Sequence, residues 1–262
     1  MSKQILKFNN IAESGLKQLS EYAVLEESDS PSAIILRSHN LHEHDFPDSL
    51  LAVGRAGAGV NNIPIDLLSE KGVVVFNTPG ANANAVKEIV LSAMLLASRN
   101  LFAAHDFVKT LSGTDEELHK LTESNKKLFS GSELRGKTLG VVGLGAIGVL
   151  VANAANNLGM KVVGFDPAIS IKNAWHLSSR VEQAPDLNSL YGQSDYITFH
   201  VPLNKNTENL FSEEHLDLVQ AGAVVMNFSR DGIVNTNAMV KGLENEKIAN
   251  YCTDFPLSLI HI

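Results

Sequence analysis

The segment VVGLGAIG, with glycines at 143, 145 and 148, constrains the fold of this chain more than any other feature. An apolar run precedes it and a helical pattern follows it, so it predicts a strand, a tight turn and a helix. Gly143 would allow the bend, Gly145 would let a pyrophosphate approach the backbone, and Gly148 would permit close packing of helix and strand. The free N–H groups of the helix N-terminus would then bind the phosphates.

An acidic residue lies at the distance that such a turn requires. The next predicted strand ends at Asp166, 23 residues after Gly143. A carboxylate there would bind the adenine ribose and repel a 2′-phosphate, which favours NAD over NADP. A glycine-rich turn in another kind of α/β domain is the alternative, and the strand, the spacing and the acid together disfavour it.

Unbroken apolar runs alternate with amphipathic segments along most of the 262 residues, which is typical of an α/β protein with parallel sheets. We expect a first domain at residues 1–85 and a second at residues 86–256. The second would begin with a long helix at residues 84–100, followed by a polar arm that is too long for a simple connection. The arm is expected to pack on something else, such as a neighbouring subunit.

Charge and cysteine content exclude several classes of function. The net charge of −8 argues against a nucleic-acid-binding surface, although a local cluster of donors could still bind a small anion. The single cysteine, Cys252, can form neither an internal disulfide nor a paired-thiol metal site. The most apolar helical segment carries Lys87 and Glu88 and is too short to span a bilayer. We therefore expect a cytoplasmic protein without a membrane partner.

Two further segments could bind an anion. GRAGAGVNN, residues 54–62, exposes successive backbone N–H groups beside Arg55 and could hold a carboxylate or a phosphate. In NFSRDGIVN, Arg230 directly follows a predicted strand, where ligands bind in open α/β sheets, and could clamp a carboxylate. Simple turn geometry and an ordinary surface arginine are the alternatives.

The segment HNLHEHD contains His39, His42 and His44, whose spacing would suit a metal site. No cysteine accompanies them, and they follow the predicted strand AIILRS, so we expect a polar loop and no bound metal.

The motifs VVGLGAIG, FDP, HVPL, NFSRDGIVN and TDF stand in the order found in the D-isomer-specific 2-hydroxyacid dehydrogenases, which the chain resembles up to Pro256. ILRSH, GRAGAGVNNIP and FNTPGANANAVKE resemble one branch of that family, the D-3-phosphoglycerate dehydrogenases. The resemblance implies a flavodoxin-like substrate domain, a Rossmann-type, doubly wound NAD-binding domain and a cleft between them. It also implies that the full-length protein is a homodimer or a higher homo-oligomer, to which the long helix and the arm contribute.

The resemblance assigns residues to both ligands. Cofactor contacts fall on Thr78, Gly143, Gly145, Ala146, Ile147, Gly148, Asp166, Val201, Pro202, Phe228, Ser229, Arg230 and Asp254. Substrate contacts fall on Arg37, Arg55, Gly57, Ala58 and Asn82. Arg230 matches the catalytic arginine of the family, which holds the substrate carboxylate beside the nicotinamide.

The implied reaction is NAD-dependent oxidation of a small anionic 2-hydroxy acid. Arg37, Arg55 and Arg230 would suit a doubly anionic acid, D-3-phosphoglycerate, oxidised to 3-phosphohydroxypyruvate at the entry to serine biosynthesis. Another 2-hydroxyacid dehydrogenase acting on a smaller acid, or a non-catalytic NAD-sensing protein, are the alternatives.

The resemblance stops abruptly after CTDFP. In the family, the catalytic glutamate and histidine come later, whereas here no glutamate follows Glu246, and His261 lacks the flanking Pro and Gly. We hypothesise that residues 257–262, LSLIHI, are not native, because a widely used transposase sequencing adapter encodes the same six residues. A natural truncation with a drifted tail is the alternative. In either case we expect weak NAD binding, no useful dehydrogenase activity and a less stable first domain.

Overall fold

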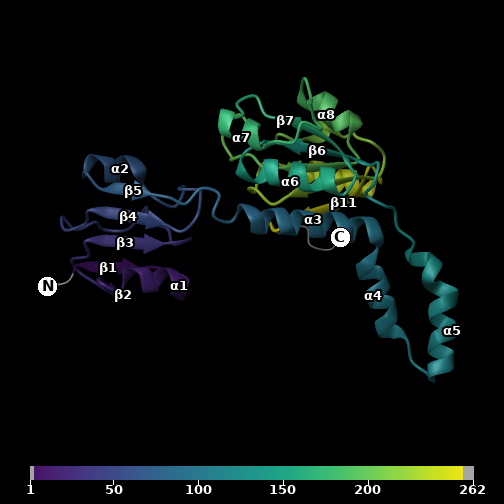
Figure 1. Cartoon of the computed structure of the whole chain (residues 1–262), viewed down its shortest axis with the longest axis horizontal. Helices are drawn as coiled ribbons and strands as arrows, with labels where there is room; N and C mark the ends of the chain where they lie inside the picture. The colour runs from purple at the N-terminus through teal and green to yellow at the C-terminus, as the bar shows by residue number, and fades with distance from the viewer. Residues whose placement is uncertain (1–2, 256–262) are drawn as a thin grey trace. The chain divides into compact units, whose positions relative to one another are not determined.

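The computed structural model describes residues 3–255 and divides into two compact units, Met1–Asn82 and Ala83–Ile262 (Figure 1). The tail that we expect to be non-native, residues 257–262, lies outside the described residues. None of the helices within residues 3–255 is long and apolar enough to cross a membrane.

Unit 1 is built on a five-stranded parallel sheet with the strand order β2-β1-β3-β4-β5. This is the order of flavodoxin-like domains, so the prediction of a flavodoxin-like fold is confirmed. The strands are β1 (Gln4–Lys7), β2 (Ala23–Leu25), β3 (Ala33–Leu36), β4 (Ala52–Arg55) and β5 (Val74–Phe76), and the helical segments are α1 (Glu13–Leu16), η1 (Lys17–Leu19) and α2 (Ile65–Glu70). Its core contains the fully buried Leu36, Val53 and Leu68.

Unit 2 contains a six-stranded parallel sheet with the order β11-β10-β9-β6-β7-β8. Numbered within the unit, this is the 3-2-1-4-5-6 order of a Rossmann fold, as the glycine motif predicts. The strands are β6 (Thr138–Val142), β7 (Lys161–Phe165), β8 (Val181–Gln183), β9 (Tyr196–Phe199), β10 (Ala223–Asn227) and β11 (Ile248–Thr253). The other elements are α3 (Ala83–Arg99), α6 (Ala146–Asn157), α7 (Ile171–His176), α8 (Leu187–Gln193), η3 (Glu213–His215) and α9 (Thr236–Glu244).

Two apolar clusters form the core of unit 2. In one, Val90 and Met94 of α3 pack with Val151 of α6 and Val141 of β6. In the other, Tyr191 of α8 packs with residues that include Phe199 and Phe211. Continuous apolar strands such as Ala223–Asn227 are buried at every position, because packed residues cover the sheet on both faces.

The predicted arm is a helical excursion from unit 2, made of α4 (Leu101–Thr110), α5 (Asp115–Asn125) and η2 (Lys126–Phe129) (Figure 1). Its two ends meet, since the N–H of Ser132 donates to the carbonyl of Ser98 at 2.8 Å. Asn100 lies in the left-handed region, with φ +50°, and its side chain donates to the Ser130 carbonyl at 3.0 Å. Gly131 lies so close to the Ser98 carbonyl that a Cβ there would clash.

Candidate functional site

The three glycines of the turn are constrained in different ways. Gly143 has φ +90°, and a Cβ there would lie 2.6 Å from the His200 carbonyl oxygen. A Cβ on Gly148 would overlap the Gly143 carbonyl oxygen. By contrast, a Cβ on Gly145 would meet nothing within 4 Å. The first and third glycines are therefore required by the protein's own packing, whereas the space at Gly145 is open for a ligand to approach.

Helix α6 starts directly at this opening. Its N-cap residue is Gly145, and no side chain caps its first N–H groups with a hydrogen bond. Ala146 is exposed and Ile147 is half-buried at its first turn. The donors of the first turn and the positive end of the helix dipole thus face the space above Gly145, which fits a bound pyrophosphate.

Asp166 follows β7 and is half-buried beside the turn. Its Oδ2 accepts a 2.8 Å hydrogen bond from the Leu144 N–H, and its Oδ1 accepts a 2.9 Å bond from the Ala168 N–H. The Gly143 N–H in turn donates to the Phe165 carbonyl at 2.8 Å. Each carboxylate oxygen has a second lone pair that a ribose hydroxyl can use.

The remaining predicted cofactor residues of unit 2 lie at the same edge of the sheet. The strand register pairs Val142 with both Phe165 and Phe199, and Asn227 with both Phe199 and Thr253. Because all these strands are parallel, the residues that follow them share the carboxyl edge. That group comprises Gly143, Asp166, Val201, Pro202, Phe228, Ser229, Arg230 and Asp254. Its centre is the switch point between β6 and β9, where ligands bind in doubly wound sheets.

Arg230 is exposed in the loop after β10. Its Nη1 donates to the Ser229 carbonyl at 2.6 Å, and its own carbonyl accepts a 2.8 Å bond from Asn227 Nδ2. Asn227 Oδ1 also accepts from the Ser229 hydroxyl at 2.9 Å. The buried Asn227 side chain therefore fixes the backbone that presents the guanidinium group.

His200 lies at the same switch point, and sequence reasoning missed it. Its N–H donates to the Val142 carbonyl at 2.7 Å, and its ring Nε2 lies 3.0 Å from Thr198 Oγ1. Its buried Nδ1 has no hydrogen-bond partner among residues 3–255. Burial lowers the pKa of His200 to about 4, so the ring is neutral at pH 7. A histidine at the end of an apolar strand, directly before Val-Pro, was the available signal.

In unit 1, residues at the carboxyl ends of three strands bind one another. The Gly57 N–H donates to Thr78 Oγ1 at 2.7 Å, and the Thr78 N–H donates to the Gly57 carbonyl at 3.0 Å. Arg55 Nε donates to the Arg37 carbonyl at 3.1 Å, and its guanidinium covers the position that a Gly57 Cβ would take. In this arrangement the Gly57 N–H, one of the donors expected to bind an anion, is hydrogen-bonded to Thr78.

The other predicted substrate residues of unit 1 are less closely connected. The Ala58 carbonyl accepts a 2.7 Å bond from Asn77 Nδ2. Arg37 and Asn82 are exposed, and Asn82 is the last residue of the unit. The structure thus brings Arg37, Arg55, Gly57 and Thr78 together by direct hydrogen bonds, while Asn82 stands apart from that set.

The three histidines of the first unit engage aromatic rings and backbone. His39 stacks on Phe8 with ring centroids 4.0 Å apart, and His44 meets the edge of the same ring at 5.4 Å. His42 Nε2 lies 2.8 Å from the Asn61 carbonyl oxygen. Across residues 3–255, no group of three or more histidine, cysteine or acidic side chains could hold a metal ion.

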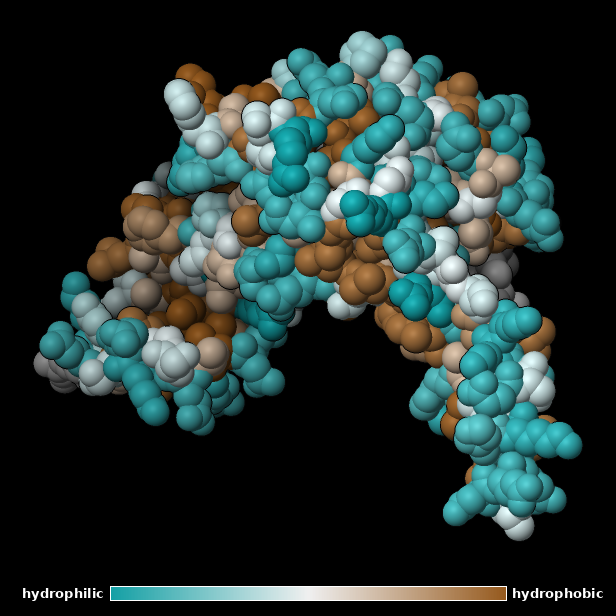
Figure 2. Space-filling view, turned by 45° about the vertical axis from the view of Figure 1, so that its right-hand side comes forward, coloured by the Kyte–Doolittle hydropathy of each residue, from teal (hydrophilic) through white to brown (hydrophobic). Residues whose placement is uncertain are grey.

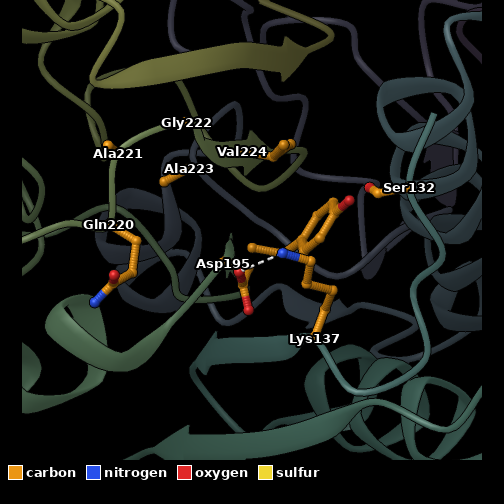
Figure 3. Close-up of a pocket in the computed structure, with 9 residues that line it drawn as sticks. Ser132, Lys137, Asp195, Gln220, Ala221, Gly222, Ala223 and Val224 are labelled. Carbon is orange, nitrogen blue, oxygen red and sulfur yellow. Dashed lines mark hydrogen bonds and ion pairs between the residues drawn. The ribbon is translucent and has the colours of Figure 1, made fainter. Parts of the chain in front are cut away.

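A cavity of about 100 Å³ lies at the opposite edge of the unit 2 sheet, by the amino ends of β6, β9 and β10 (Figure 3). Figure 3 shows Lys137 and Asp195 pointing toward one another across it, and their charged groups are 3.0 Å apart. The second Asp195 oxygen accepts from the Thr138 N–H at 2.8 Å. Since its charges are paired and it lies away from the glycine turn, this cavity is not the candidate site.

Comparisons with known proteins agree with this geometry. The family model for the NAD binding domain of D-isomer specific 2-hydroxyacid dehydrogenases matches residues 91–257. The D-3-phosphoglycerate dehydrogenase of Methanocaldococcus jannaschii is 34% identical over 88% of this chain and 42% of its own length. That of Synechocystis sp. is 34% identical over 90% of this chain and 41% of its own length. The chain thus spans about two fifths of the length of these relatives.

Among solved structures, the D-mandelate dehydrogenase of Rhodotorula graminis matches with a TM-score of 0.77 at 23% identity. The match covers 100% of this chain and 84% of that chain, and at this identity it supports the fold alone. The sequence match carries the family assignment: the chain belongs to the D-isomer specific 2-hydroxyacid dehydrogenases, and its second unit contains their NAD-binding domain.

Proposed function

We propose that a complete form of this protein oxidises D-3-phosphoglycerate to 3-phosphohydroxypyruvate, the entry step to serine biosynthesis, with NAD as the hydride acceptor. The open space at Gly145, between the N-terminus of α6 and the Asp166 carboxylate, carries the cofactor part of the proposal. The similarity to D-3-phosphoglycerate dehydrogenases over about nine tenths of the chain supports the substrate part.

The residues of unit 2 would hold the cofactor through donors that the fold already orients. The N–H groups at the start of α6, from Ala146 onward, would bind the pyrophosphate. Asp166 would accept a hydrogen bond from the adenine ribose and disfavour a 2′-phosphate at the same position. Val201, Phe228 and Asp254 would line the rest of the carboxyl edge.

Arg230 would bind the substrate carboxylate by two parallel charge-assisted hydrogen bonds. In the structure its guanidinium donates to the Ser229 carbonyl, so it must exchange this backbone bond for the carboxylate. Arg37 and Arg55 of unit 1 would supply the positive charge for a phosphate. This charge would favour a doubly anionic acid over a lactate-like acid.

The substrate hydroxyl must also lose a proton, and His200 is unsuited to accept it. The residue is half-buried, burial lowers its pKa to about 4, and its Nε2 lies 3.0 Å from Thr198 Oγ1. Our proposal therefore includes a base and its carboxylate partner supplied by residues beyond Pro256 in a complete chain. On this proposal residues 1–262 alone do not turn over substrate, and residues 257–262 are not native.

The decisive experiment is to sequence the source gene past Pro256 and express the completed chain. NADH formation from D-3-phosphoglycerate should exceed that from D-lactate or D-glycerate by a wide margin in kcat/KM, with residues 1–262 as a negative control. Preference for a smaller acid would replace this proposal with another 2-hydroxyacid dehydrogenase. NADH binding without turnover of any such acid would favour an NAD-sensing protein.

We also propose that the partner of the arm is a second copy of the chain. Phe102 of α4 and Leu128 of η2 are 68% and 71% exposed, which is unusual for large apolar side chains. Figure 2 shows apolar residues along the lower edge of unit 2 and down the arm. Covering such a surface with the same surface of a second copy would give a two-fold symmetric dimer.

A further inference from the structure

The loop that carries Arg230 contains Asp231–Gly232, the single Asp-Gly pair of the sequence. Asp231 is exposed, and Gly232 adopts φ +83°. The backbone N–H of Gly232 donates a 3.0 Å hydrogen bond to Oδ1 of Asp231 itself. The folded loop thus holds this amide nitrogen within reach of the side-chain carboxyl group that precedes it.

This arrangement permits a known intramolecular reaction of aspartate. The Gly232 nitrogen attacks Cγ of the protonated Asp231 carboxyl group, the N–Cγ bond forms, and one water molecule leaves with the carboxyl OH and the amide hydrogen. The product is a five-membered succinimide. Water then adds to either carbonyl of the ring and restores aspartate or gives isoaspartate, whose backbone runs through Cβ and Cγ. Glycine favours the attack because it has no Cβ to obstruct it.

We propose that Asp231 converts spontaneously to isoaspartate in the folded protein and that this conversion displaces Arg230. The backbone is fixed on both sides of Asp231. Asn227 Nδ2 binds the Arg230 carbonyl at 2.8 Å, and the Asn209 N–H binds the Gly232 carbonyl at 2.8 Å. Isoaspartate inserts one extra backbone atom between these anchors, so at least one of them must release. This inference goes beyond the proposed function and does not depend on it.

The test is to age the folded chain in warm neutral buffer and map isoaspartate with time. Trypsin cleaves after Arg230 and releases residues 231–241, in which Asp231 is the sole aspartate. Isoaspartate is detected by methyl transfer with a protein isoaspartate methyltransferase, and the isomeric peptides are separated by chromatography. We expect severalfold more isoaspartate at Asp231 than at the exposed Asp29 or Asp48. Both reference residues precede serine, which slows the attack.

Two variants make the assignment specific. The Asp231→Glu variant should form no isomerised residue at position 231, because the cyclic imide of glutamate would need a six-membered ring. Gly232→Asn should lower it severalfold, because asparagine tolerates the positive φ but adds a Cβ. Hydrogen exchange at residues 227–230 should rise in step with isoaspartate in the unmodified chain. If isoaspartate at Asp231 forms only in the urea-unfolded protein, or no faster than at Asp29 and Asp48, the proposal is wrong. Unchanged hydrogen exchange at residues 227–230 in the aged chain would refute the displacement of Arg230.

Discussion

The Asp166 carboxylate receives a 2.8 Å hydrogen bond from the backbone N–H of Leu144, inside the glycine turn. The residue proposed to select the cofactor therefore also holds the glycine turn in place. One side chain links the ends of β6 and β7, and its second oxygen fixes the start of the next loop through Ala168. Substitutions at Asp166 should for this reason affect both the fold and the cofactor preference.

Asp166→Ala should lower the free energy of unfolding by about 1–3 kcal/mol, because two backbone donors lose a charged acceptor. It should also weaken NAD binding and relax the discrimination against NADP. Urea denaturation measures the free energy of unfolding. Quenching of the fluorescence of Trp175, the single tryptophan, measures the affinities for NADH and NADPH. Tighter NADPH than NADH binding by the unmodified chain would refute the assignment of Asp166.

Gly145→Ala and Gly148→Ala should separate ligand binding from folding. Alanine at Gly148 overlaps the Gly143 carbonyl, and overpacking of this kind costs about 1–3 kcal/mol or more. Alanine at Gly145 meets no protein atom, so its cost should stay below about 1 kcal/mol, while the methyl group obstructs the pyrophosphate. Denaturation midpoints and NADH titrations of both variants provide the check. Equal losses of stability would contradict the different roles given to the two glycines.

Much of the fold could be predicted from local patterns. The runs TLGVVGL, KVVGFD, DYITFHV, AVVMNFS and IANYCTDF all became strands of unit 2, because parallel strands covered on both faces are apolar throughout. The helix expected at residues 84–100 is α3, Ala83–Arg99. Gly159 follows α6 with φ +82°, the conformation in which glycine commonly ends a helix. These features depend on residues close in sequence.

Features that depend on distant contacts were harder to predict. The short edge strand β8 and the helix α7 carry too few apolar residues to show a period. The apolar spacing of SEEHLDLVQ is typical of a helix, but the segment forms only the three-residue turn η3. There His215 packs on Tyr191 and Phe211, and its Nδ1 accepts a hydrogen bond from the Ser212 N–H. The Gly57–Thr78 bond joins residues 21 apart, which no local pattern reveals.

Unfolding should become easier as the pH falls from 6.5 to 4, in part because of His200. Burial lowers the pKa of this ring from 6.5 to about 4, so between these values the unfolded chain binds a proton that the folded chain does not. Above pH 6.5 His200 is neutral in both states and does not reduce the free energy of unfolding. As the pH falls to 4, protonation of the unfolded chain lowers the free energy of unfolding by about 3 kcal/mol.

Replacing His200 should therefore flatten this pH dependence. Urea midpoints of His200→Gln between pH 4.5 and 7.5 should change less with pH than those of the unmodified chain. His105→Gln, on the exposed face of the arm, serves as the control and should keep the original slope. The same slope in all three proteins would show that His200 titrates normally.

Arg230→Ala in a completed chain should reduce kcat/KM by about 10- to 150-fold, the loss expected for a charge-assisted bond to the substrate. NADH affinity should change less, because most of the proposed cofactor contacts remain. Arg180→Ala is a matched control, since Arg180 is an exposed arginine of the same unit that binds Asn157. A turnover rate equal to that of the unmodified enzyme would remove Arg230 from the proposed site.

The arm offers a test of the proposed dimer that leaves the unit 2 core intact. Phe102→Glu and Leu128→Glu each place a charge on a side chain that is largely exposed within one chain, so either should alter the stability of a monomer by less than about 0.5 kcal/mol. In a dimer the same charge would be buried against apolar side chains, which is far more costly.

Lys120→Glu, an exposed change of charge on α5, controls for the electrostatic effect. Sedimentation equilibrium should therefore find a dimer for the unmodified chain and Lys120→Glu, and a monomer for the other two variants. A monomeric unmodified chain at every accessible concentration would mean that the arm binds something other than a second copy.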